Sequence, residues 1–133
     1  MKVDGQCHCG EIRYEAEIDA SKVGICHCND CQVLTGSAYR VSVPASAAKL
    51  KFLKGTPKVY IKTAESGNKR AQGFCADCGS PIYATDAHKP ETYFLRVGTL
   101  SQRAALPPKR QIWCEAELPW AADIRALERR ERA

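Results

Sequence analysis

Apolar and polar residues alternate without a break along Glu11–Ile18. The apolar positions share one face: Ile12, Tyr14, Ala16 and Ile18. A period of two residues predicts a β-strand with one buried and one solvated face. This strand begins two residues after Cys9, so the first pair of thiols, Cys7 and Cys9, leads directly into a sheet.

Further stretches of apolar, β-branched and aromatic residues predict other short strands. They cover Tyr39–Val43, Leu50–Leu53, Lys58–Thr63, Arg70–Phe74, Ile82–Thr85, Thr92–Leu100 and Gln111–Leu118. Turn-forming residues lie between them, as in Lys54–Pro57 and Ser66–Asn68. Because short strands dominate, the sequence predicts an all-β fold with minor helix.

Three segments are expected to be helical. Asn29 or Asp30 can cap a short helical turn that runs through Leu34 and ends at Gly36. A proline at its start favours a second turn over 44–48. A peripheral helical tail could form over 121–133, where Ile124 and Leu127 are the only apolar anchors.

The length of 133 residues is sufficient for one core and too short for two, so residues 1–133 are expected to form a single domain. Met1–Gln6 has no apolar signal-peptide core, and no apolar run is long enough to span a membrane. A cytoplasmic location is therefore expected. Thiols stay reduced there, so clustered cysteines indicate metal binding rather than disulfides.

Seven of the eight cysteines form three clusters. The clusters are the pair Cys7 and Cys9, the trio Cys26, Cys28 and Cys31, and the pair Cys75 and Cys78. Thiols two residues apart on an extended backbone point the same way, and thiols three residues apart meet across a tight turn. Both spacings reach the separation of about 3.8 Å between sulfurs around a tetrahedral zinc ion.

Two arrangements of zinc are compatible with these clusters. In the one we favour, the two pairs form a four-cysteine structural site, and the trio holds a second zinc with one open position. In the other, the trio and the Cys75/Cys78 pair share one site, and Cys7 and Cys9 stay free. Cys114 could close the trio, although its place on the apolar face of a predicted strand favours a small core residue.

The histidines carry weaker signals than the thiols. His8 and His27 each lie between two cysteines, so on an extended backbone they point away from a metal held by those neighbours. They are expected beside a site or at the surface, and His27 is the nearest candidate for a general base. The formal charge of +5 falls to about +2 once seven thiolates and two zinc ions are counted, so no nucleic-acid partner is expected.

Five motifs give the chain a resemblance to a known family. They are Gly5–Gly10, Cys26–Cys31, Thr35–Ala38, Phe74–Ser80 and Leu118–Trp120. In this order, and over nearly the whole length, they resemble the glutathione-dependent formaldehyde-activating enzyme family, which also includes centromere protein V. The resemblance implies a zinc-binding β-tent of packed antiparallel sheets with two zinc ions.

The same resemblance implies a structural zinc on one set of thiols and a catalytic zinc on the other. The first set is Cys7, Cys9, Cys75 and Cys78, and the second is Cys26, Cys28 and Cys31. The founding enzymes condense glutathione with formaldehyde, formally a carbon–sulfur lyase reaction. A small thiol such as glutathione is therefore the expected ligand, and no membrane partner is expected. The alternative is a non-catalytic interaction module in which both zinc ions are structural.

Two positions depart from what members of that family commonly carry. A basic residue often follows the third thiol of the trio, where this chain has Gln32 and Val33, and a histidine often precedes the last Ile-Trp, where Gln111 stands. Because glutathione brings two carboxylates, the missing cations lower its expected affinity. Four other cations could meet those carboxylates: Arg40, Lys62, Lys69 and Arg70.

Overall fold

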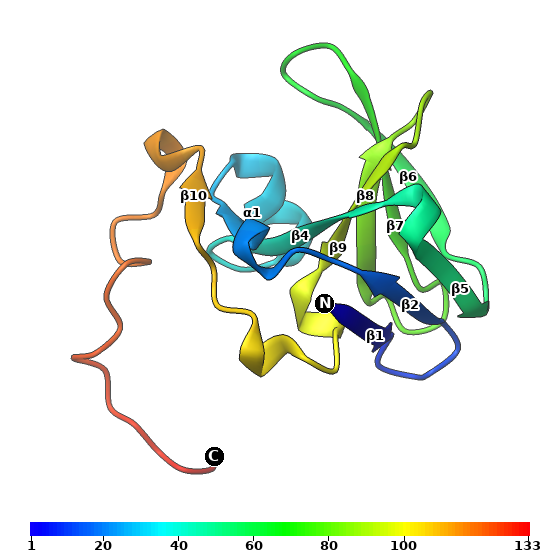
Figure 1. Ribbon diagram of the computed structural model, residues 1–133. Coiled ribbons are helices and arrows are strands. Elements are labelled where there is room, and N and C mark those ends of the chain that lie inside the picture. Colours follow the sequence, from blue (N-terminus) through cyan, green and yellow to red (C-terminus); the bar gives the residue numbers. More distant parts are fainter.

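The protein is described by a computed structural model that covers residues 1–133 and contains two β-sheets (Figure 1). The smaller sheet has the strand order β1-β2-β5. Its strands are β1 (Lys2–Gln6), β2 (Arg13–Glu17) and β5 (Leu50–Lys54), all antiparallel. Strand β2 lies within the alternating stretch that predicted it.

The larger sheet has seven strands in the order β10-β3-β4-β9-β8-β7-β6. They are β3 (Gly24–Cys26), β4 (Arg40–Ser46), β6 (Lys58–Thr63), β7 (Lys69–Phe74), β8 (Pro81–Asp86), β9 (Thr92–Arg96) and β10 (Arg110–Ile112). The neighbouring strands are antiparallel except β10 and β3, which run parallel. The resemblance implies packed antiparallel sheets, and this parallel pair at one edge is an exception within them.

The two sheets pack face to face around one core. Tyr14 and Ala16 of β2 are buried against residues of the larger sheet such as Val43 and Leu95. Aromatic rings bridge the layers, because Phe52 of β5 lies 5.9 Å from the Tyr14 ring and 6.2 Å from the Tyr83 ring. The predicted all-β class with minor helix is confirmed.

The one α-helix, α1 (Asn29–Thr35), follows β3 and carries the third thiol of the trio. Its N-cap is Cys28 rather than Asn29 or Asp30, since the Cys28 sulfur accepts a hydrogen bond from the Cys31 backbone N–H at 3.3 Å. Gly36 ends the helix with φ 64°, a left-handed conformation that favours glycine.

Two strand boundaries differ from the prediction. Pro44 lies inside β4 instead of starting a helical turn, and the turn is a short 3₁₀ helix at Ala47–Lys49. A proline is tolerated there because β3 pairs with β4 only as far as Ser42, which leaves β4 as an edge on that side. Strand β9 ends at Arg96, where a 3₁₀ helix at Val97–Thr99 replaces the rest of the predicted strand.

The C-terminal part of the chain departs furthest from the prediction. Strand β10 stops at Ile112, and Cys114 lies exposed in a 3₁₀ helix, so the expectation of a buried core thiol is wrong. The expected helix over 121–133 is absent, and this segment runs as turns away from the sheets (Figure 1). Its two apolar anchors, Ile124 and Leu127, stay exposed, so no packing compensates for the cost of starting a helix.

No helix of the protein has the length and apolar character needed to cross a bilayer.

Candidate metal centres and the adjoining cleft

Four thiols meet where two turns approach each other. Cys7 and Cys9 lie in the turn after β1, and Cys75 and Cys78 lie in the turn between β7 and β8. The Cys7 and Cys9 sulfurs are 3.6 Å apart, and the Cys9 and Cys75 sulfurs are 3.8 Å apart. Tetrahedral zinc requires separations of about 3.8 Å between its sulfur ligands, so this group fits a closed four-thiolate site.

Local hydrogen bonds hold these thiols in place. The Ile12 backbone N–H donates to the Cys7 sulfur at 3.2 Å, and the Ser80 hydroxyl lies 3.3 Å from the Cys78 sulfur. The Ser80 side chain is the main cause that lowers the pKa of Cys78, to about 5. His8 is exposed and uses its backbone N–H, rather than its ring, to donate to the same Ser80 hydroxyl. Ser80 therefore favours the thiolate form of Cys78, which is the form that binds a metal.

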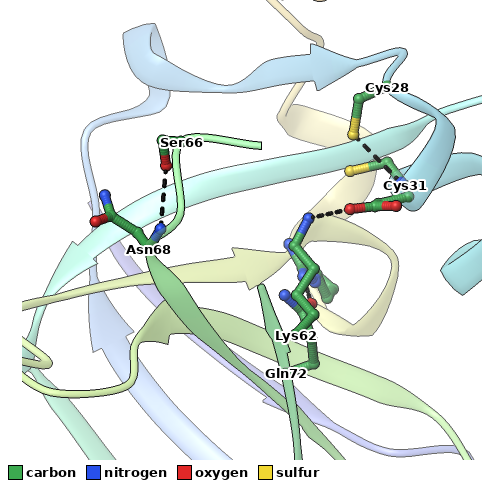
Figure 2. Close-up of polar contacts among 8 residues, drawn as sticks. Cys28, Cys31, Lys62, Ser66, Asn68 and Gln72 are labelled. Atoms are coloured by element: carbon green, nitrogen blue, oxygen red, sulfur yellow. Dashed lines mark hydrogen bonds and ion pairs between the residues drawn. The ribbon is translucent and has the colours of Figure 1, made fainter. Parts of the chain in front are cut away.

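The trio forms a second, separate group. Cys26 ends β3, Cys28 caps α1 and Cys31 lies in its first turn, and their sulfurs all lie within 4.8 Å of one another. Figure 2 shows Cys28 and Cys31 side by side, joined by the cap hydrogen bond. Three half-buried sulfurs at these separations suit zinc and leave one tetrahedral position to another ligand.

The grouping of the seven thiols selects between the two arrangements left open by the sequence. Cys75 and Cys78 lie with Cys7 and Cys9 and not with the trio, so the shared four-cysteine site does not form. Cys114 is not among the thiols that gather within 4.8 Å around the trio. The protein thus offers one group of four thiols and one group of three.

The trio has an uneven electrostatic environment. The hydrogen bond between Cys26 and Cys31 is the largest cause of two opposite shifts: it lowers the pKa of Cys31 to about 5 and raises that of Cys26. Contact with the Arg40 guanidinium lowers the pKa of Cys31 further. A cation beside the sulfurs therefore stabilises negative charge on the trio.

The trio opens into a cleft with a volume of about 290 Å³. Six basic residues line this cleft, and no acidic residue does. The basic residues are Lys22, Arg40, Lys62, Arg70, Arg96 and Arg110. Apolar contacts come from Ile112, Trp113, Phe94 and Leu34, among others. The cleft suits a small anionic ligand with some apolar surface.

Cross-strand register explains why these side chains gather. Cys26 pairs with Arg40, and Ser42 pairs with both Gly24 and Arg96. Residues directly opposite each other, or two apart on one strand, share a face of the sheet. The cleft is therefore one face of the larger sheet, and Val43 and Leu95, on the opposite face, belong to the core.

Two of the cations are buried in the cleft floor. Arg40 is 5% exposed and Arg96 is 7% exposed. Arg96 donates to the Ser42 hydroxyl and to the Gln72 side-chain oxygen, both at 2.8 Å. Burial, and then the nearby charge of Arg40, lower the pKa of Arg96 to about 9. This value lies above neutral pH, so Arg96 remains a cation there.

Of the four cations proposed from the sequence, three line the cleft and Lys69 does not. Lys62 of β6 forms an ion pair of 2.8 Å with Asp30 of α1, and Figure 2 shows its side chain pointing toward Cys31. Arg70 lies over the Phe94 ring at 5.6 Å. Lys22, Arg96 and Arg110 also line the cleft, although they are not among the cations expected from the sequence. Arg96 alternates with buried Leu95 and Val97, a signal that it faces away from the core.

His27 is buried and does not line the cleft. Its Nε2 lies 2.8 Å from the Gln111 side-chain oxygen, and its Nδ1 has no hydrogen-bond partner. The surface position considered for His27 is wrong, and nothing places its ring against a ligand in the cleft. Gln32 donates to the carbonyls of His27 at 2.8 Å and Ala116 at 3.0 Å. Gln32 and Gln111, the two glutamines that depart from the family pattern, therefore both form hydrogen bonds within the protein.

Known proteins resemble this chain in sequence and in fold. Residues 2–116 match the family described as "Glutathione-dependent formaldehyde-activating enzyme". A Halomonas elongata protein named "Putative glutathione-dependent formaldehyde-activating enzyme" is 25% identical over 115 residues, which cover 83% of this chain and 73% of that one. An "Uncharacterized lyase" of Schizosaccharomyces pombe is 24% identical over 98 residues, 69% of this chain and 64% of that one.

The fold has a counterpart among solved structures. The crystal structure of a Rhodobacter sphaeroides protein matches with a TM-score of 0.62 at 20% identity, over 81% of this chain and 98% of that chain. At this identity the match shows a shared fold and nothing about activity.

Proposed function

This chain belongs to the glutathione-dependent formaldehyde-activating enzyme family, and from that premise we propose that it is a zinc-dependent carbon–sulfur lyase-like enzyme. It binds a small thiol of the glutathione class at the trio Cys26, Cys28 and Cys31 and condenses it with a small aldehyde such as formaldehyde. The four-thiol group of Cys7, Cys9, Cys75 and Cys78 holds a structural zinc. The names of two relatives, a formaldehyde-activating enzyme and a lyase, support this assignment.

One observation carries the proposal: the three-thiol group opens into a cleft lined by six cations and no carboxylate. A closed structural site has no need of a cleft. The cleft also supplies the positive charge that Gln32 and Val33, directly after Cys31, do not provide. Arg40 supplies that charge from β4, because it pairs with Cys26 across the strands.

The sulfurs of Cys26, Cys28 and Cys31 would hold the zinc ion of this site. When bound, zinc supplies a fourth position at which a small thiol is kept as a thiolate at neutral pH. The protein's own residues then position the reactants. The guanidinium groups of Arg40 and Arg96 attract the carboxylate of the thiol, and Phe94 and Trp113 exclude water from part of the cleft.

The overall reaction needs no oxidant or reductant. The thiol sulfur forms a bond to the aldehyde carbon, and the proton lost by the thiol ends on the aldehyde oxygen. No histidine, aspartate or glutamate lines the cleft, so solvent carries this proton. The cations of the cleft that do not hold the carboxylate can stabilise the negative charge that develops on the aldehyde oxygen.

Exchange NMR with carbon-13 formaldehyde and glutathione tests the proposal, because it measures the interconversion of free aldehyde and hemithioacetal directly. The zinc-loaded protein should accelerate this exchange, and Cys28→Ser should return it to the uncatalysed rate. Cys114→Ser is the matched control, since Cys114 is exposed and outside the trio. If the wild-type protein leaves the exchange rate unchanged, the enzyme proposal fails and the interaction module becomes the better interpretation.

A further inference from the structure

Two buried guanidinium groups beside the trio have no anionic oxygen partner. The side chains of Arg40 and Arg96 line the cleft and are more than nine-tenths buried. Neither takes part in any ion pair of the molecule. A buried charge is costly unless it is paired, so the floor of the cleft is built to receive an anion.

The environment of each arginine fixes its position without neutralising it. Arg96 donates to two neutral oxygens, those of Ser42 and Gln72, and its Nε has no partner. The Nε of Arg40 also has no partner, and Arg40 lies directly across the strands from Cys26 of the trio. The two groups are near enough for the charge of Arg40 to lower the pKa of Arg96. They form one positively charged floor.

The positive charge in the cleft exceeds the negative charge of the trio. Three thiolates and one zinc ion carry a net charge of minus one, whereas Arg40 and Arg96 carry two positive charges. Lys62 is paired with Asp30 at 2.8 Å, and Lys22, Arg70 and Arg110 add three further positive charges to the cleft. The cleft can therefore accept a ligand that brings both a thiolate and a carboxylate.

We infer that Arg40 and Arg96 form a carboxylate site in the cleft floor and that the thiol ligand carries its carboxylate close to its sulfur. The thiol half of this inference rests on the proposed function. A guanidinium matches a carboxylate through two parallel hydrogen bonds, which neither an ester nor an alcohol can replace with equal strength. The site therefore selects thiol carboxylates over neutral and cationic thiols.

The strand register places Arg40 next to the trio. Cys26 and Arg40 are direct cross-strand partners, and Cα atoms of such partners lie about 5 Å apart. A short acid such as 3-mercaptopropionate spans the step from the trio to the arginines. Glutathione reaches the same site with one of its two carboxylates, and Arg70 or Arg110 lies in the cleft to meet the other.

A matched pair of ligands tests the site in the cobalt-substituted protein, whose absorption reports on the ligands of the metal. The pair is 3-mercaptopropionate and its methyl ester, which have the same thiol and differ only in the charge. The acid should bind at least about tenfold more tightly than the ester, as expected for a charge-assisted hydrogen bond. Arg96→Gln should reduce this ratio to near one, whereas Arg13→Gln, an exposed substitution on β2, should leave it unchanged.

Each outcome decides the inference. Equal affinity for acid and ester in the wild-type protein overturns it, and so does a preference for the acid that survives in both Arg40→Gln and Arg96→Gln. A second measurement is independent of thiol binding: propionate should raise the melting temperature of zinc-loaded wild-type protein and not that of Arg96→Gln. If no thiol changes the cobalt spectrum but propionate still protects, the proposed function fails and the anion site stands. If propionate does not protect either, both fail.

Discussion

Cys26 of β3 and Arg40 of β4 stand directly opposite each other in an antiparallel register. The pairing puts a cation, 5% exposed, against the group of three thiols. Position 40 lies nine residues after Cys31 in the sequence, beyond the helix α1 and its Gly36 cap, so no local motif marks it. The positive charge beside the trio therefore comes from the neighbouring strand and not from a residue next to the trio in the sequence.

We expect the reduced protein to hold two zinc ions per chain. The expectation rests on separate groups of four and three thiols at separations that suit tetrahedral zinc. A competing chelator should remove the two ions in two phases, with the trio zinc leaving first because its sulfurs line an open cleft. Metal analysis combined with a colorimetric chelator measures both quantities. One zinc per chain in fully reduced protein would rule out the second site.

The two thiol groups should differ in their effect on stability. Cys75→Ser should lower the free energy of unfolding by an amount on the order of 5 kcal/mol, because this group ties the turn after β1 to the turn after β7 and metal binding there is coupled to folding. Cys28→Ser should cost much less, because the trio lies within one segment of six residues. Chemical denaturation of the zinc-loaded variants compares them. Similar losses would contradict a division into structural and open sites.

Much of the fold could be predicted because its signals are local. The alternation over Glu11–Ile18 predicted β2, and the turn residues at Ser66–Asn68 separated β6 from β7. The division of the thiols also followed from spacing, since two pairs and a trio are what the structure brings together. That these groups hold zinc stays a prediction.

Non-local contacts account for what the sequence could not show. Arg40 and Arg96 became neighbours only through the register of β4 with β3 and β9. The alternation over Gln111–Leu118 suggested a long strand, yet β10 ends at Ile112, where the parallel pairing with β3 also ends at Cys26. Beyond that point β10 has no partner strand to pair with, and Cys114 is exposed to solvent.

Gly5→Ala should destabilise the fold. A Cβ at position 5 would lie 2.4 Å from the ring of Tyr14, its cross-strand partner, and Tyr14 is fully buried. We expect a loss of about 1–3 kcal/mol in the free energy of unfolding, as for other overpacked cores. Gly98→Ala is the control, because nothing lies within 4 Å of a Cβ there. Equal denaturation midpoints for the two variants would contradict the close approach of Gly5 and Tyr14.

Gln32→Ala should loosen the wall of the cleft. The Gln32 amide donates to the carbonyls of His27 and Ala116, and so joins α1 to the segment after β10. Losing it leaves two carbonyls without that donor and should cost about 1–2 kcal/mol. Val33→Ala is the control, since Val33 is 81% exposed on the same helix. Limited proteolysis after Trp113 should speed up in Gln32→Ala alone, and unchanged cleavage in both would argue against the tie.

Trp113 is the one non-glycine residue with a positive φ, at φ 56° and ψ 39°, and it lines the cleft beside the trio. This left-handed conformation costs an L-residue about 1–2 kcal/mol, whereas glycine adopts it freely. Trp113→Gly should therefore be more stable than Trp113→Ala by about 1 kcal/mol, although glycine destabilises most other positions.

Ligand binding separates strain from function in the same pair of variants. Both lack the indole, so both should bind 3-mercaptopropionate more weakly than the wild-type protein and to a similar degree. Denaturation measures the first difference, and titration of the cobalt-substituted variants measures the second. Trp120→Ala is the control for the loss of an indole, because Trp120 is 62% exposed and lies outside the cleft.

If Trp113→Ala proves as stable as Trp113→Gly, the backbone at this position is not strained. If both variants bind the thiol as the wild-type protein does, the indole is not part of the cleft wall that the ligand meets.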